Sequence, residues 1–314
     1  MDRIDYLAER RTPFIFIISF NKSEVIVEEL SNLSGDILFD IEGFRNYSEM
    51  EIDREFQFSR EPIPFREYKI AFDEVIEEIK RGNTYLLNLS FRSKIETELT
   101  LEEIFHISKA KYKIYLKGRF VCFSPEKFIE IRDNKISTYP MKGTIDAGIC
   151  GAKDTILNNQ KEMAEHIMIV DLMRNDLGMV GSDVKVRRFR YIDKIRAGDK
   201  ELLQVSSEIT AKLPKDWRAN LGSILNRLLP AGSVTGTPKR STVDIIDRVE
   251  NYDRGFYTGI FGIFTGDALY SAVMIRFIEE ESRKLFYKSG GGITIDSSLE
   301  SEYQELIDKI YIPV

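Results

Sequence analysis

One lysine of this sequence lies where it could act either as an anion-binding cation or as a nucleophile. Lys142 directly precedes Gly143 and Thr144 in the stretch YPMKGT. Glycine lets a backbone approach a ligand closely, and a threonine hydroxyl can hydrogen-bond to that ligand. Glu126 follows a Ser-Pro pair at a predicted turn, sixteen residues earlier. If a hairpin brings them into one cleft, an acid and an amine could divide proton transfer and nucleophilic attack between them.

Two pairs of glutamates could bind a cation. Glu162 and Glu165 are three residues apart in one predicted helix, and Glu302 and Glu305 are three apart in another. This spacing places each pair on one helix face. Taken alone, each pair also fits an ordinary solvated face. If the two helices meet, four carboxylates would form an oxygen-rich site suited to Mg²⁺.

Two glycine-rich stretches resemble phosphate-binding loops only superficially. In AGSVTGTPKRST (231–242) Pro238 precedes Lys239 and Arg240 follows it, whereas a nucleotide-binding loop has glycine before its lysine and Ser or Thr after. Proline also lacks a backbone N–H that could bind phosphate. We therefore do not expect nucleotide binding. The run SGGGIT (289–294) is a weak signal, and we interpret it as a turn before the last helix.

The elements that must position these residues alternate in blocks of strands and helices. Periodicity and turn signals predict strands within 13–30, 84–95, 112–123, 128–132, 135–140, 256–265, 268–279 and 283–288. Helices are predicted from Tyr68 to Gly82, over 100–110 with a Thr100–Glu103 capping box, over 156–177 ending at Gly178, and over 215–228 and 238–250. A final helix capped by Ser297 runs to about 310, and 45–65 is expected to be a connecting loop. Blocks of this kind predict an α+β fold.

Composition excludes several classes of protein. With a net charge of −6, a pI near 5.3 and no basic stripe, nucleic acid is not an expected partner. No segment approaches the roughly 20 apolar residues of a membrane helix, and the N-terminus is too polar for a signal peptide. Cys122 and Cys150 are far apart and lack neighbouring metal ligands. We therefore expect no disulfide or zinc site, and a reducing cytoplasm fits best.

Eight sequence blocks occur in a specific order within about residues 68–312, namely FSPEKF, YPMKGT, KEMAEHIMIVDLMRNDLG, LLPAGSVTGTPK, RGFYTGIFG, MIRF, GGGITIDS and ESEYQELIDKI. In their order and spacing these blocks resemble those of the chorismate-utilising enzymes. The family includes anthranilate, aminodeoxychorismate, isochorismate and salicylate synthases. The resemblance implies a four-layer α/β/β/α sandwich of the anthranilate synthase component I type, with the active site in a cleft between the sheets. It also implies one catalytic domain over 1–314 with a shortened N-terminal region, about 1–65, and no tryptophan pocket.

The same resemblance implies roles for individual residues. It assigns Mg²⁺ binding, and through it the ring carboxylate of chorismate, to Glu162, Glu165, Glu302 and Glu305. Arg276 and Tyr257 correspond to residues that bind the enolpyruvyl carboxylate, and Glu126 to the acid that protonates the departing C4 hydroxyl. The remaining predicted substrate contacts are Gly143, Thr144, Ser233 and Gly292.

Differences from individual relatives narrow the predicted reaction. Isochorismate and salicylate synthases have a water-activating lysine where this chain has Leu86, so we do not expect water addition. Anthranilate synthases have alanine at the position of Lys142, whereas lysine there is similar to aminodeoxychorismate synthase component I. A histidine usual in anthranilate synthases is Gln204, and a usual threonine is Phe277, whose consequence the sequence does not reveal. The prediction is 4-amino-4-deoxychorismate synthesis for 4-aminobenzoate and folate, with anthranilate synthesis for tryptophan as the alternative.

Ammonia is expected to come from a separate subunit. The chain offers no candidates for the Cys-His-Glu triad of a glutamine amidotransferase and no segment for a pyridoxal-phosphate lyase. We therefore predict a glutamine amidotransferase partner, with free ammonia as the other source, and aminodeoxychorismate as the product. A covalent role also predicts that burial and cationic neighbours lower the pKa of Lys142. A non-catalytic chorismate-binding protein is the rival class, which the retained acid, lysine and glutamates disfavour.

Overall fold

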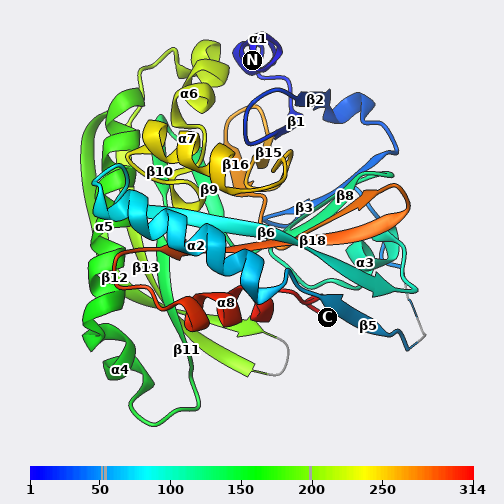
Figure 1. Ribbon diagram of the computed structural model, residues 1–314. Helices are drawn as coiled ribbons and strands as arrows, with labels where there is room; N and C mark the ends of the chain where they lie inside the picture. Colours follow the sequence, from blue (N-terminus) through cyan, green and yellow to red (C-terminus); the bar gives the residue numbers. More distant parts are fainter. Residues whose placement is uncertain (51, 53–54, 198–199) are drawn as a thin grey trace.

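The computed structural model describes residues 1–50, 52, 55–197 and 200–314 (Figure 1). Its α-helices are α1 (Asp2–Glu9), α2 (Phe65–Lys80), α3 (Leu101–Ile107), α4 (Ala152–Asn158), α5 (Gln160–Val180), α6 (Leu221–Leu228), α7 (Lys239–Val249) and α8 (Leu299–Asp308). Short 3-10 helices are η1 (Leu30–Asn32), η2 (Trp217–Asn220) and η3 (Gly232–Val234). The predicted capping box is confirmed, since the Thr100 hydroxyl accepts from the backbone N–H of Glu103 while the Glu103 side chain accepts from that of Thr100.

The described strands form two antiparallel sheets of nine strands each. The first follows the order β11-β13-β10-β9-β16-β15-β1-β2, with β12 beside β13. Its strands are β1 (Phe14–Ile18), β2 (Val25–Glu29), β9 (Lys127–Arg132), β10 (Lys135–Thr138), β11 (Met141–Asp146), β12 (Ser182–Ala197), β13 (Lys200–Lys212), β15 (Ile260–Phe264) and β16 (Leu269–Val273). The second follows β14-β6-β18-β17-β8-β7-β3-β4, with β5 beside β6. Its strands are β3 (Ile37–Ile41), β4 (Phe44–Arg45), β5 (Phe58–Glu61), β6 (Leu86–Thr97), β7 (Tyr112–Leu116), β8 (Phe120–Ser124), β14 (Gly236–Thr237), β17 (Phe277–Glu281) and β18 (Lys284–Ile293).

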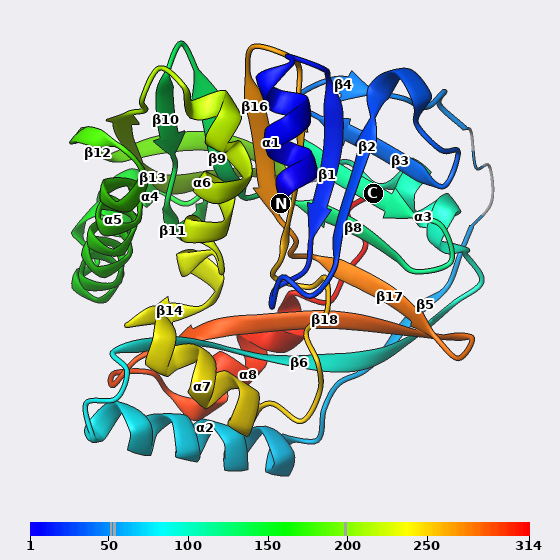
Figure 2. The same ribbon diagram turned by 90° about the horizontal axis from the view of Figure 1, so that it is seen from above.

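The two sheets pack face to face between helices, which confirms the predicted α+β fold with four layers, α/β/β/α. Along β1, Phe14 and Phe16 contact a core shared with α1, α5 and α6, while Ile15 and Ile17 contact the core between the sheets. This follows from the two-residue repeat of a strand, which sends alternate side chains to opposite faces. On the far side, β6 and β18 pair along their length and carry α2, α7 and α8 (Figure 2). A buried apolar layer therefore lies on each side of both sheets.

The predicted strand over 268–279 is in fact two strands that belong to different sheets. β16 ends at Val273 in the first sheet and β17 begins at Phe277 in the second. Between them Arg276 has φ +55°, a left-handed conformation that costs a non-glycine residue free energy. The apolar pattern conceals this change of sheet because β16 and the first two residues of β17, Phe277 and Ile278, are all buried. The crossing places Arg276 at the junction of the two sheets.

Other local expectations were also wrong. The glycine run is not a turn, because Gly290, Gly291 and Gly292 lie in β18 and pair with Ser90, Leu89 and Asn88 of β6. Helix α5 continues through Gly178 and ends at Val180, where the backbone N–H of Gly181 closes the last turn. The N-cap position of α8 is Ser298 rather than Ser297. The Ser297 hydroxyl instead donates to Glu302, so this serine orients a predicted site residue.

The segment predicted as a loop, 45–65, contains the strand β5, and its residues 51, 53 and 54 lie outside the described part of the chain. Among the described helices, none is long and apolar enough to cross a membrane.

Candidate active site

A cavity of about 230 Å³ between the sheets collects most of the predicted site residues; we call it the central cavity. Nine of the twelve line it, namely Glu126, Lys142, Gly143, Thr144, Ser233, Tyr257, Arg276, Gly292 and Glu305. A second and wider cavity of about 570 Å³ lies along α8 and shares Arg276, Glu305 and Lys309 with the first. Residues from both sheets and from α8 therefore meet at two adjoining cavities.

Glu126 faces the central cavity from the turn between β8 and β9. The Ser124 hydroxyl accepts from the backbone N–H of Glu126 at 3.0 Å, which fixes this turn. The Glu126 carboxylate accepts a hydrogen bond from the Ser233 hydroxyl. Burial raises the pKa of Glu126, although Ser233 and the charges of Lys142, Arg276 and Lys309 oppose the shift. A carboxyl that holds its proton more tightly than usual is suited to act as a general acid.

Lys142 reaches the cavity because β11 is irregular at this point. The pairing of β11 with β13 changes register between Met141 and Thr144, and Gly143 has φ +81°. A bulge of this kind re-aims a side chain, and a positive φ favours glycine. A Cβ on Gly143 would lie 3.2 Å from Glu162 Oε2. The positive φ and the nearby carboxylate together explain why glycine occupies position 143.

The structure contradicts the expected direction of the Lys142 pKa. Burial lowers this pKa, as expected, but the ion pair with Glu165 and the charges of Glu305 and Glu162 outweigh burial, so the pKa is raised. Lys142 Nζ lies 3.1 Å from Glu165 Oε2. Sequence reasoning considered cationic neighbours and overlooked the carboxylate next to the amine.

The two predicted glutamate pairs approach the cavity from opposite sides. On α5, Glu165 is 8% exposed and binds Lys142, and the Glu162 carboxylate lies beside Gly143. On α8, Glu302 is buried and accepts from Ser297, and Glu305 binds Lys309 at 2.6 Å. The charges of Glu162, Glu165 and Glu305 all act on Lys142, which places both helices near the same amine.

No set of three or more His, Cys, Asp or Glu side chains is arranged to hold a metal ion within the described residues. The Mg²⁺ site therefore remains a prediction. The donor set nevertheless suits a hard cation, since all four side chains are carboxylates. The α8 pair also lies close to β18, because a Cβ on Gly291 would lie 3.4 Å from Glu302 Oε2 and 3.7 Å from Glu305 Oε1. The residues are compatible with Mg²⁺ once the ion pairs to Lys142 and Lys309 rearrange.

Arg276 and Tyr257 face the cavity together, as the resemblance implied for a carboxylate site. The Nε of Arg276 is buried and has no hydrogen-bond partner within the described protein. A buried donor without a partner carries a free-energy cost, which an anionic ligand could remove. Burial raises the pKa of Tyr257, so its phenol remains a neutral donor. The pair fits a carboxylate.

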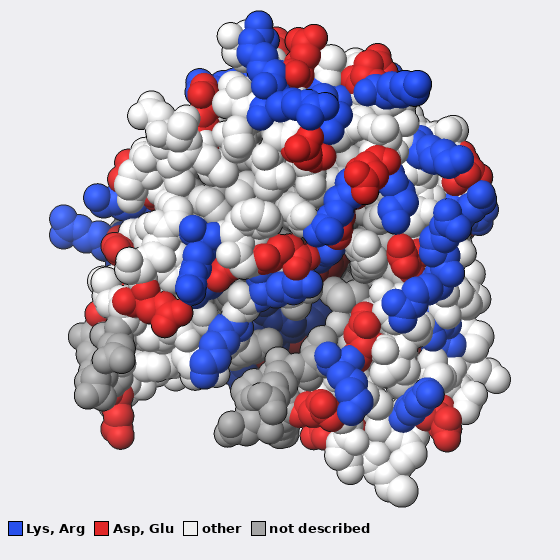
Figure 3. Space-filling view, turned by 180° about the vertical axis from the view of Figure 1, so that it is seen from behind, with Lys and Arg blue, Asp and Glu red and all other residues white. Residues whose placement is uncertain are grey.

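Among the lining residues that sequence reasoning missed are Lys309, Lys288 and Asn88. Lys309, the C-cap residue of α8, follows Glu305 by four residues, so helical spacing could have found it. Asn88 lies two residues after Leu86 on the same face of β6, and its Oδ1 is buried without a partner in the described chain. With Lys142 and Arg276, the two new lysines give the cavity four cationic side chains. Lys and Arg side chains also lie within a hollow on the face shown in Figure 3.

The chain matches the family model for chorismate binding enzymes over residues 27–313. It belongs to the chorismate-binding enzyme family. An uncharacterised PabA-like protein of Haemophilus influenzae is 47% identical over 315 residues, which cover 100% of this chain and 96% of that protein. Aminodeoxychorismate synthase component 1 of Salmonella typhimurium is 33% identical over 260 residues, covering 78% of this chain. This chain spans only 56% of that relative's length.

The fold comparison agrees with the family. The crystal structure of anthranilate synthase component I from Streptococcus pneumoniae aligns with a TM-score of 0.67 and 24% identity, covering 81% of this chain and 58% of that one. At this identity the likeness concerns the fold alone. Family membership and fold are thus common to enzymes with different products, and the reaction must be argued from the cavity.

Proposed function

We propose that this protein is an aminodeoxychorismate synthase component I, which converts chorismate and ammonia to 4-amino-4-deoxychorismate. The observation that carries the proposal is that Lys142 and Glu126 face one cavity. One substrate could therefore meet both an amine and a carboxylic acid, and the pKa of that acid, Glu126, is raised. The aminodeoxychorismate synthase relative supports the assignment. Leu86 lies close to Lys142, because a Cβ on Gly292 would be 3.3 Å from Lys142 Nζ and 3.9 Å from Leu86 Cδ1, and leucine offers no base to activate water.

Two displacements would account for the reaction. The neutral amine of Lys142 forms a bond to ring C2 while the C4 hydroxyl departs as water, protonated by Glu126. Ammonia then forms a bond to C4, and the bond from C2 to the lysine breaks with return of its electron pair. The lysine nitrogen gives up a proton when its bond to C2 forms and takes a proton back when that bond breaks. The new ammonium group on C4 returns a proton to Glu126, so nitrogen replaces the hydroxyl without any net oxidation.

The substrate carries two carboxylates, and the cavity offers a binding group for each. Arg276 and Tyr257 would bind the enolpyruvyl carboxylate, and Gly143, Thr144, Ser233 and Gly292 would line the ring. Glu162, Glu165, Glu302 and Glu305 would hold Mg²⁺, which supplies positive charge to the ring carboxylate when bound. Lys142 must be neutral to attack, so the proposal requires that its ion pair with Glu165 opens in the productive complex.

Ammonia would come from a glutamine amidotransferase partner, as the component 1 name of the relative suggests. We also place the enzyme in the cytoplasm, in keeping with its free cysteines Cys122 and Cys150.

A product assay tests the proposal. Purified protein is incubated with chorismate, Mg²⁺ and an ammonium salt, and the products are separated and identified by mass spectrometry. Aminodeoxychorismate is expected, and its formation should disappear in Lys142→Ala but persist in Lys153→Ala, which removes an exposed lysine of α4. Anthranilate as the product would replace the proposal by the alternative reaction. Unchanged chorismate with ammonium salt and with an added amidotransferase would overturn both.

A further inference from the structure

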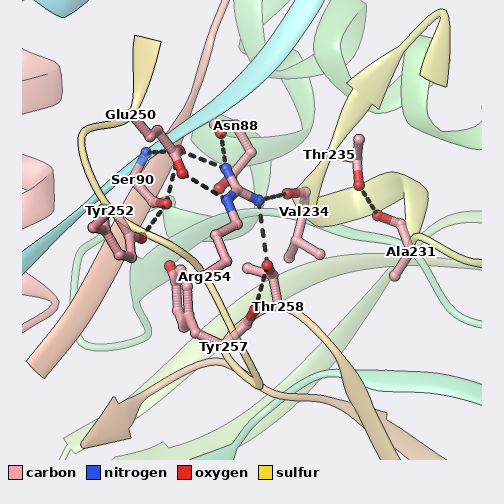
Figure 4. Close-up of polar contacts among 10 residues, drawn as sticks. All are labelled: Asn88, Ser90, Ala231, Val234, Thr235, Glu250, Tyr252, Arg254, Tyr257 and Thr258. Carbon is pink, nitrogen blue, oxygen red and sulfur yellow. Dashed lines mark hydrogen bonds and ion pairs between the residues drawn. The ribbon is translucent and has the colours of Figure 1, made fainter. Parts of the chain in front are cut away.

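Arg254 is a buried cation close to the central cavity that does not line it. The residue is 3% exposed and lies in the segment between α7 and β15. Its guanidinium pairs with Glu250, whose oxygens accept from Nε at 2.8 Å and Nη2 at 2.6 Å (Figure 4). Two-point pairing of this kind fixes the plane of the guanidinium.

The remaining donors of Arg254 reach three different segments. Nη2 donates to the backbone carbonyl of Asn88 at 2.6 Å, and Nη1 donates to that of Val234 at 2.8 Å. Nη1 also donates to the hydroxyl of Thr258 at 3.3 Å. All five N–H groups of the guanidinium therefore have partners, which a lysine ammonium with three donors cannot reproduce.

Glu250 extends the network to the strand that forms one wall of the cavity. Its Oε1 accepts from both the backbone N–H and the hydroxyl of Ser90, each at 2.8 Å, and the Ser90 hydroxyl contacts Tyr252 at 2.7 Å. Ser90 and Asn88 belong to β6, which pairs with the glycines of β18. The ion pair of Arg254 and Glu250 therefore fixes the cavity-side part of β6.

Each segment held by Arg254 carries a residue that faces the cavity. Asn88 does so itself, and Val234 directly follows Ser233, the residue that donates to Glu126. Thr258 directly follows Tyr257, donates to its carbonyl at 2.6 Å, and has a strained φ of +60°. One buried guanidinium thus joins three walls of the central cavity.

We propose that Arg254 is a positioning residue for the acid step, acting through Val234 and Ser233 on Glu126 and through Thr258 on Tyr257. The inference rests on the proposed function, because it takes Glu126 as the proton donor. A displacement of about 1 Å in a reacting group lowers turnover by roughly a hundredfold. Arg254 should therefore affect kcat more than the KM for chorismate.

The test is a double-mutant cycle of Arg254→Lys and Ser233→Ala. Each single variant is expected to lower kcat about 10- to 100-fold. Each should also move the alkaline limb of the pH profile upward, since the Ser233 hydrogen bond lowers the pKa of Glu126. The groups that act on Glu126 are Ser233, Lys142, Arg276 and Lys309. Of these four groups, the cycle substitutes only Ser233, so the three cations remain in both single variants and in the double variant. The double variant should resemble the worse single variant, because coupled residues are not additive.

The matched control is Lys113→Met. Lys113 is also a buried cation that donates to backbone carbonyls, those of Phe105 and Ser108, but it lies beside α3 and outside the cavity lining. The Lys113→Met substitution should lower the melting temperature without changing kcat or the alkaline limb of the pH profile. If Arg254→Lys does not fold, Glu250→Gln keeps the side-chain volume, weakens the same pairing and takes its place in the cycle.

Additive effects, or a loss of stability with kcat and the pH limb unchanged, would overturn the positioning role. If the wild type does not consume chorismate at all, the proposed function fails instead. In that case ¹³C NMR of labelled glutamate carboxyls still decides: the titration of Glu126 must move upward in Arg254→Lys and stay in place in Lys113→Met, and an unmoved titration refutes the inference.

Discussion

Lys142 Nζ lies 3.1 Å from Glu165 Oε2, so the proposed nucleophile is paired with a proposed metal ligand. An amine in an ion pair is held protonated, and a protonated amine does not attack carbon. If Lys142 is the nucleophile of the proposed reaction, the same contact keeps it inactive until the ion pair opens. Lys142 could therefore have one of two roles. It is a permanent cation if the ion pair stays closed, and it can act as a nucleophile if the ion pair opens.

Lys142→Arg distinguishes these two roles. Arginine retains the positive charge and can still pair with Glu165, but it remains protonated and cannot serve as the nucleophile. We expect aminodeoxychorismate formation to fall below detection, while chorismate binding, measured by titration calorimetry, changes by less than about tenfold. An arginine variant that retained a substantial rate would show that Lys142 acts only through its charge.

Glu126→Gln should lower turnover and raise stability together. Loss of a general acid lowers rates by about 10²- to 10⁴-fold. Because the pKa of Glu126 is raised above its usual 4.5, the folded state binds a proton more tightly than the unfolded chain. The free energy of unfolding therefore falls as pH rises from 4.5 through the raised pKa, and the penalty persists at higher pH. Glutamine removes that penalty and still accepts from Ser233.

Urea unfolding at pH 5 and pH 8 measures this effect. The gain in stability of Glu126→Gln should be larger at pH 8, and the exposed residue of α1 in Glu9→Gln should show no such difference. A glutamine variant equally stable or less stable at pH 8 would mean that the carboxylate is well accommodated in its ionised form, which is unsuitable for an acid.

Gly143→Ala should impair the site more than the fold. Alanine in the left-handed region costs about 1–2 kcal/mol, and its Cβ would meet Glu162 at 3.2 Å and Ile156 at 3.4 Å. The control is Gly82→Ala, whose φ of +76° is similar but whose Cβ would meet nothing within 4 Å. Both should lose similar stability in thermal unfolding, and only Gly143→Ala should lose most of its turnover. Equal activity in the two variants would contradict the assigned position of Gly143.

Much of this site could be predicted because its chemistry lies in short, ordered blocks. Lys142, Glu126 and the glutamate pairs keep recognisable neighbours along the chain, and helical spacing places each glutamate pair on one face. The α+β fold likewise followed from the alternation of strand and helix blocks.

What the sequence did not reveal depends on contacts between distant segments. The change of sheet at Arg276 has buried apolar residues directly before and after it, such as Met274 and Phe277, so the apolar pattern does not mark it. The glycines of β18 resembled a turn because their neighbours, Lys142 beside Gly292 and the α8 glutamates beside Gly291, come from elsewhere in the chain. The raised pKa of Lys142 has the same origin, since Glu165 lies 23 residues further along.

Removal of Mg²⁺ should abolish turnover, and its addition should stabilise the protein. Carboxylates from α5 and α8 approach one cavity, where a divalent cation would relieve their mutual repulsion. At a concentration 100 times its Kd, a ligand of the folded state adds about 2.7 kcal/mol to the free energy of unfolding.

Thermal unfolding with EDTA and with Mg²⁺, in the absence of substrate, measures this effect. Mg²⁺ should shift the melting temperature upward, and Glu162→Gln and Glu302→Gln should reduce that shift. The exposed α2 residue in Glu67→Gln serves as the control and should keep the full shift. If Mg²⁺ stabilises the wild type and the glutamate variants equally, the four carboxylates are not its ligands, and the ion pair of Lys142 and Glu165 must be opened by the substrate alone.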